Sequence, residues 1–186
     1  FQKIEFYKKL VSKKIRFNSV KKNLIDLIWK EKLKKKKSNP FYHPEEFNGQ
    51  KSEQKIKKII KYTQKNKADG YYINSSESVC WLFNLRADDL QYSPLLLSKS
   101  IIQKNGDCFV FTDARNLKNH HLTKKIKVFF KPLNMFNNFI SSNDQKNKKY
   151  ICCPNEITYN EVINFNKNNG KLIFKENIIN KLKSIK

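Results

Sequence analysis

A chain of 186 residues is long enough for one domain with a single hydrophobic core, and its 39% hydrophobic content is compatible with a folded globule. The formal net charge is +23, but 36 of the 39 basic residues are lysine, because arginine occurs only at Arg16, Arg86 and Arg115. Four widely spaced glycines exclude a glycine-rich phosphate loop and a dinucleotide-binding fingerprint.

The amino-terminal part of the chain is rich in lysine. Residues 1–22 form an amphipathic segment whose apolar residues recur near helical spacing: Ile4, Tyr7, Leu10 and Val11. A short apolar turn follows at residues 23–29 (NLIDLIW), and the run of lysines at residues 34–37 indicates a solvated linker.

A helix is predicted from Ser52 to about Asn66. The Ser52 hydroxyl can accept free backbone N–H groups of the first turn, and Glu53 suits the positive end of the helix. The helix has a buried apolar stripe: Ile56, Ile59 and Ile60.

The stretch 69–94, DGYYINSSESVCWLFNLRADDLQYSP, holds the densest mixture of functional side chains in the chain. It is predicted to form a buried strand at residues 71–73, a serine turn capped by Ser75 or Ser76, and a short helix carrying Trp81. The polar loop after this helix contains the candidate functional residues Asn84, Arg86, Asp88, Asp89 and Tyr92.

Strands and helices alternate after Pro94. Apolar runs at residues 95–102 and 107–112 flank an Asn105–Gly106 turn, which is a strong hairpin signal. Further elements are expected as strands at 127–130, 150–153 and 171–174, a short helix at 133–140, and a helix capped by Thr158 and Glu161. This pattern predicts an α/β fold, with a mixed β-sheet flanked by helices.

Cysteine and histidine are the residues that would reveal a metal site or a nucleophile. Cys80, Cys108, Cys152 and Cys153 show no CxxC pairing, so we expect free, mostly buried thiols and a reducing, cytoplasmic location. Neighbouring His120 and His121 point to different sides of a helix or strand, and His43 in a proline-bounded turn is expected to be structural. No apolar run approaches the roughly 20 residues of a membrane span.

Three motifs resemble the aminopeptidase P (Xaa-Pro aminopeptidase) family, of the creatinase/prolidase type. NLRADDLQYSP resembles the family signature N-L-R-G-x-D-I-x-Y-x-P, with Ala87 in place of glycine. NPFYHPEEFNGQKSEQKI at residues 39–56 resembles the connection N-P-x-F-x-H-P-x-E-F-x-G-x-S-x-x-x-K-I. NLIDLIW resembles the entry into the family's middle domain, and the last residues, 183–186, resemble the first helix of its catalytic domain.

The resemblance implies a creatinase-type amino-terminal fold. It also implies three parts: residues 1–22 end a preceding domain or linker, residues 23–175 form a middle domain, and residues 176–186 begin the catalytic-domain helix. We therefore expect residues 39–175 to fold cooperatively and both ends to be frayed, because the ends lack their neighbours in the parent protein.

The family's activity resides in a later domain, where two divalent metal ions, usually manganese, activate the water that cleaves the bond before proline. None of those ligand motifs occurs in this chain. The resemblance thus implies a noncatalytic middle domain whose partners are the catalytic domain of the same polypeptide and, through the parent enzyme, a peptide with proline second. It also implies a homodimeric, cytoplasmic parent. For this segment alone we assign no catalytic residue, metal ligand or cofactor.

Two other hypotheses remain open. The chain could be a freestanding basic module that binds nucleic acid or another polyanion, or an inactive paralogue that serves as a partner subunit. Because nucleic-acid sites usually use arginine forks as well as bulk charge, we attribute the lysine excess mainly to composition bias, and we do not expect a nucleic-acid partner.

The substrate-cleft or interdomain candidates are Asn84, Arg86, Asp89 and Tyr92. Arg86 stands out because the chain otherwise uses lysine, which suggests that the planar guanidinium matters. Its structural interpretation is an internal salt bridge to Asp88 or Asp89 that pins the loop. Its functional interpretation is a contact with the substrate cleft or the adjoining domain.

Overall fold

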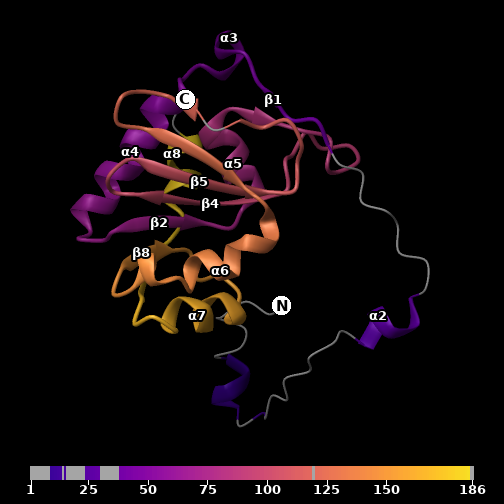
Figure 1. Cartoon of the computed structure of the whole chain (residues 1–186), viewed down its shortest axis with the longest axis vertical. Coiled ribbons are helices and arrows are strands. Elements are labelled where there is room, and N and C mark those ends of the chain that lie inside the picture. Colours follow the sequence, from indigo (N-terminus) through magenta and orange to yellow (C-terminus); the bar gives the residue numbers. More distant parts are fainter. Residues whose placement is uncertain (1–8, 14, 16–23, 30–37, 119, 185–186) are drawn as a thin grey trace.

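The computed structural model describes residues 9–13, 15, 24–29, 38–118 and 120–184 (Figure 1). These residues contain a seven-stranded mixed sheet in the order β6-β7-β5-β4-β2-β8-β9. Its strands are β2 Gly70–Ile73, β4 Ser98–Gln103, β5 Asp107–Thr112, β6 His120–His121, β7 Lys127–Lys131, β8 Lys149–Cys152 and β9 Lys171–Phe174. A separate ribbon pairs β1 (Phe41–Tyr42) with β3 (Leu85–Arg86). The predicted α/β class with a mixed sheet is confirmed.

Helices cover both faces of the sheet (Figure 1). The larger core lies under α4 (Ser52–Lys65), α5 (Ser76–Phe83) and α8 (Ile178–Lys183). The smaller, aromatic core lies under α6 (Phe136–Ile140) and α7 (Tyr159–Asn166). The remaining helical elements are α2 Leu24–Ile28, α3 Glu45–Asn48, and the 3-10 turns η1 Leu133–Met135 and η2 Asn143–Gln145.

Strand β2 lies inside the sheet and contributes to both cores. Because successive side chains of a strand point to opposite faces, Tyr71 packs in the larger core and Tyr72 in the smaller one. The strand pairs antiparallel with β4 and parallel with β8, so its backbone is bonded on both edges. This burial places the end of β2, and the α5 segment that follows it, on a rigid base.

The predicted hairpin is confirmed, since β4 and β5 pair antiparallel. Gly106 in its turn has a φ of 103°, and a Cβ there would lie 2.0 Å from the Lys125 carbonyl oxygen. Only glycine fits this turn.

The predicted helix caps are mostly confirmed. Ser75 accepts the Ser78 N–H at the start of α5, and Thr158 and Glu161 form the capping box of α7. The predicted cap of α4 is wrong by one residue: Lys51 occupies the cap position, and Ser52 is the first helical residue.

The two ends of the chain differ from each other. Most of the predicted amphipathic segment 1–22 lies outside the described residues. At the other end, α8 is packed on α5 and buries Ile179 completely, and Asn177 before it donates to Ser78 and Glu156. The expectation of a frayed carboxyl-terminal helix is therefore wrong, because α8 finds its apolar partners within this same core.

Candidate functional site

The polar loop 84–94 begins where α5 ends, on the side of the molecule that carries the β1–β3 ribbon. Strand β3 pairs Leu85 with Tyr42 and Arg86 with Phe41, so the start of the loop is joined to the segment around residue 40. Thus the two longest motifs found in the sequence, which are far apart along the chain, meet at one place in the fold.

Asn84 joins these segments. It ends α5 in the left-handed conformation, at φ 53°, and its N–H donates to the Cys80 carbonyl. Its own carbonyl accepts the His43 N–H at 2.8 Å, and its Nδ2 donates to the Gln50 carbonyl at 3.3 Å. Its Oδ1 accepts a proton from Lys55. All four polar atoms are bonded and the residue is buried, so Asn84 is an anchor rather than an exposed ligand-binding group.

Lys55 is the residue of this site that sequence analysis missed. It is 1% exposed, and its Nζ donates to the Trp81 carbonyl at 2.6 Å and lies 4.4 Å from the centre of the Trp81 ring. Burial, and secondly the charge of Arg86, lower the pKa of Lys55 to about 8. A signal was available, because Lys55 precedes Ile59 by four residues and so belongs to the buried stripe of α4.

Arg86 contacts backbone carbonyls. Its guanidinium donates to the carbonyls of Cys80 at 3.3 Å and Leu85 at 2.8 Å. The carboxylate of Asp89 accepts instead the Leu97 N–H at 2.6 Å. The expected pairing of Arg86 with Asp89 is therefore wrong, and the loop is pinned by two separate contacts.

Lys55 and Arg86 together compensate the carboxyl end of α5. The last carbonyls of a helix lack intrahelical partners and carry partial negative charge. Lys55 binds the Trp81 carbonyl and Arg86 binds that of Cys80, so two cations are held close together without a carboxylate between them. Their mutual repulsion is the second cause of the lowered pKa of Lys55.

The far end of the loop is exposed. Tyr92 is 96% exposed and has a φ of 66°, an uncommon conformation for a residue with a bulky side chain. Beside it is an open groove of about 460 Å³ with a mostly apolar lining that includes Phe41, Ala87, Asp88, Leu90, Tyr92 and Pro94. The base of the loop is thus fixed while its tip presents aromatic and acidic groups.

The chemistry of the described residues favours binding over catalysis. Among them, no group of three or more His, Cys, Asp and Glu side chains is placed to hold a metal ion. The four cysteines are free, and burial raises the pKa of each thiol, that of Cys152 to about 12, which makes them poor nucleophiles. His43 packs against Phe47, and the side chains of His120 and His121 lie outside the described residues. In this part of the chain, no helix has the length and hydrophobicity to cross a membrane.

Comparisons with known proteins agree with the motifs. A family profile described as the Creatinase/Prolidase N-terminal domain matches residues 31–186. A probable Xaa-Pro aminopeptidase P of Pyricularia oryzae is 30% identical over 117 residues, which are 61% of this chain and 19% of that protein. A second one, from Ajellomyces dermatitidis, is 40% identical over 84 residues, which are 45% of this chain and 14% of that protein.

A solved structure shares the fold. The X-prolyl aminopeptidase of Caenorhabditis elegans, described as a cytosolic enzyme with a dinuclear active site, matches 97% of this chain and 30% of its own, with a TM-score of 0.79 and 19% identity. The chain spans less than a fifth of the length of these two curated relatives. Because the profile matches most of the chain, and the relatives share one activity name, the chain belongs to the creatinase/prolidase N-terminal domain family and is a member of the aminopeptidase P group.

Proposed function

We propose that this chain is a noncatalytic middle domain of a metal-dependent Xaa-Pro aminopeptidase, an enzyme that removes the residue before proline from the amino terminus of peptides. The names of the relatives and the small share of their length that the chain spans support this proposal. In it, residues 23–175 form the middle domain, residues 1–22 end the preceding part, and residues 176–186 begin the catalytic domain. The parent enzyme is a cytoplasmic homodimer.

The metal ions of such an enzyme would not be held here. The described residues offer no set of three ligands, so the ions, manganese by resemblance to the family, would be bound by a domain beyond this segment. When bound there, they would supply an acidified water for hydrolysis. The residues of this domain would bind and orient the peptide or the neighbouring domain.

The observation that carries the proposal is the contrast between the two ends of the loop 84–94. Lys55, Asn84 and Arg86 fix its base, whereas Tyr92 and the groove beside it face outward. Such an arrangement holds an exposed group in a defined position, which is what a cleft wall requires. We assign the loop tip, with Tyr92, to the cleft wall or interdomain contact, and we assign Asn84 and Asp89 to its support.

The test is substitution in the full-length enzyme. Tyr92→Ala removes a side chain that contributes little to the stability of this domain, because it is almost fully exposed. We expect the kcat/KM for a short peptide with proline second to fall about tenfold or more while the melting temperature stays unchanged. Ile163→Ala, which truncates an exposed apolar residue on α7, is the matched control and should change neither quantity. Unchanged kinetics for Tyr92→Ala would remove the loop tip from the cleft.

A further inference from the structure

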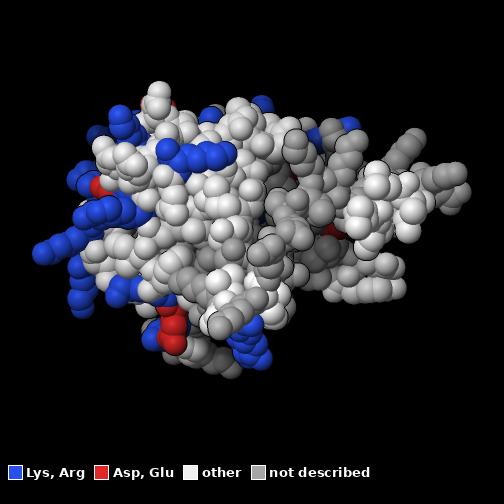
Figure 2. Space-filling view, turned by 90° about the horizontal axis from the view of Figure 1, so that it is seen from below, with Lys and Arg blue, Asp and Glu red and all other residues white. Residues whose placement is uncertain are grey.

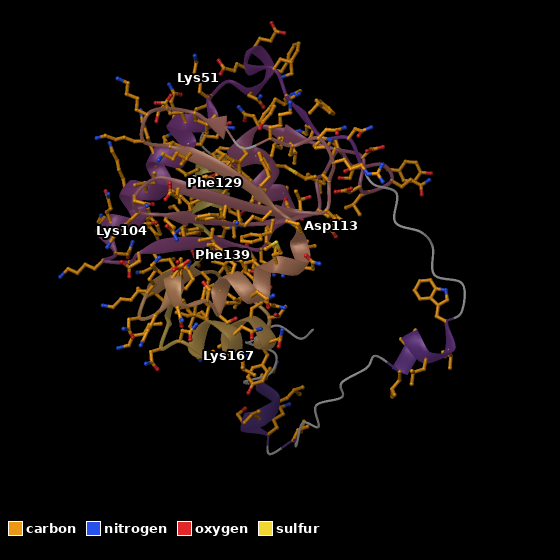
Figure 3. All side chains as sticks on the ribbon, viewed as in Figure 1. Lys51, Lys104, Asp113, Phe129, Phe139 and Lys167 are labelled. Atoms are coloured by element: carbon orange, nitrogen blue, oxygen red, sulfur yellow. The ribbon has the colours of Figure 1, made fainter. Side chains whose placement is uncertain are left out.

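The positive charge is unevenly distributed over the sheet. The register of the strands brings five segments together at one end: 65–69, 104–107, 124–127, 144–149 and 167–171. These segments, here called the basic end, contain eleven lysines and three aspartates. Figure 2 shows basic side chains gathered along its left edge with few acidic ones among them, and Figure 3 labels Lys104 on that side.

The opposite end of the same sheet is balanced. Its segments 74–77, 113–118, 131–132, 153–157 and 175–177 contain four basic and four acidic residues. Composition bias by itself would distribute lysine over both ends. The tertiary structure therefore separates a strongly positive surface from a neutral one, which sequence composition could not reveal.

An aromatic pocket opens beside the basic end. It has a volume of about 460 Å³ and lies between β5 and α6, with Phe109, Met135 and Phe139 among its lining residues. The ring centres of Phe109 and Phe139 are 4.6 Å apart, and Phe129 stacks on Phe109 at 5.3 Å. Figure 3 shows Phe129 on the sheet and Phe139 on α6.

Two lysines flank this pocket. Lys131 places its Nζ 6.0 Å from the centre of the Phe109 ring, and Lys148 comes from the basic end, where its Nζ donates to Gln145 at 3.4 Å. Asp144 also lines the pocket, and its carboxylate can accept a proton from an exocyclic amino group. A flat aromatic ring attached to an anionic backbone matches both the lining and the flanking charges.

We propose that this face binds single-stranded nucleic acid, with one base in the aromatic pocket and the adjacent phosphates over the basic end. Bases stack on aromatic side chains without regard to sequence, while lysines follow the phosphate backbone. The pocket accepts one base at a time and cannot admit a stacked duplex. This binding is independent of the peptidase function proposed above.

The test measures anisotropy of a labelled ten-nucleotide oligo(dT) with the 186-residue chain at 50 and 200 mM salt. The matched probe is an abasic strand of equal length and charge. We expect oligo(dT) to bind about fivefold or more tightly than the abasic strand, as one stacked base would give. The affinity should fall about tenfold or more between the two salt concentrations as counterions are released.

Two pairs of variants locate the contact. Asn138→Trp fills the pocket from an exposed position and should abolish the preference for oligo(dT), whereas Asn155→Trp at the balanced end should keep it. Lys148→Glu should weaken both probes about threefold or more, whereas Lys175→Glu makes the same charge change at the balanced end and should have less than a twofold effect. Circular dichroism confirms that each variant is folded.

Three results would overturn the proposal. They are equal affinity for the two probes, equal weakening by the two lysine variants, and no binding at 50 mM salt. Equal probe affinities would leave a purely electrostatic surface without a base site.

Discussion

The Nζ of Lys55 lies 2.5 Å from Oδ1 of Asn84, although 29 residues separate the two along the chain. This contact joins α4 to the end of α5, and both partners are buried. Lysine is rarely buried without a carboxylate partner, yet here two uncharged oxygens, from Asn84 and Trp81, accept its protons. The loop 84–94 therefore rests on a contact whose strength depends on the protonation of one amine.

The stability of the domain should depend on pH through Lys55. Its pKa is about 8 in the folded chain against 10.5 for an ordinary lysine. Between these values the unfolded chain binds a proton that the folded chain does not, so stability rises with pH across this interval. The full effect is about 3 kcal/mol at 1.36 kcal/mol per pKa unit.

Lys55→Met isolates this effect, because buried thiols with raised pKa, such as that of Cys152, lower stability as pH rises above about 9. The free energy of unfolding of the original chain, minus that of the variant, should increase from pH 8 to 10.5 in urea titrations. Parallel pH profiles for the two proteins would contradict a lowered pKa at Lys55.

Asn84→Ala should destabilise the domain by about 2–4 kcal/mol. It leaves the Lys55 ammonium and the Gln50 carbonyl without a partner, and it places a residue with a Cβ at a positive φ. Asn84→Gly removes the same side chain but tolerates the left-handed backbone, so it should recover about 1 kcal/mol. Equal losses for Ala and Gly in chemical denaturation would show that backbone strain contributes nothing.

Arg86 distinguishes a structural from a functional role in the full-length enzyme. Since its guanidinium binds two carbonyls, Arg86→Ala should lower the melting temperature by several degrees. If Arg86 also reaches the substrate cleft, kcat/KM should fall further than in Asn84→Gly, a variant that disturbs the same loop without removing the cation. An unaltered melting temperature together with unaltered kinetics would deprive Arg86 of both roles.

Removing the side chain of Ile179 tests whether α8 belongs to the core. Ile179→Ala should cost about 2–4 kcal/mol, because this fully buried residue would leave a cavity. Exposed Ile163→Ala serves as the control. If α8 were a frayed tail, both variants would unfold at the same urea concentration, and amides 178–183 would exchange rapidly.

The 186-residue chain should purify without stoichiometric manganese, zinc or cobalt. The reason is the lack of any three-ligand group among its described residues. Elemental analysis of the purified chain checks this prediction. About one tightly bound metal per chain, lost on substituting His120 and His121, would contradict it.

Local sequence was sufficient for most elements of the fold. The Asn105–Gly106 turn, the Ser75 cap and the capping box of Thr158 and Glu161 were all predictable, because each depends on contacts within a few residues. The α/β class followed from the alternation of these elements. The motifs likewise identified the loop 84–94 and the family to which the chain belongs.

The partners of buried polar groups were decided by the tertiary structure. Sequence reasoning joined Arg86 to its nearest carboxylates, whereas the fold offers it helix-end carbonyls and gives Asp89 the Leu97 N–H. It also overlooked Lys55, because one lysine in a lysine-rich chain carries no signal until its neighbours are known. Local patterns fix a backbone whose bonds are local, but the environment of a side chain depends on residues that only folding brings together. The same reason separates the basic end of the sheet from the balanced one.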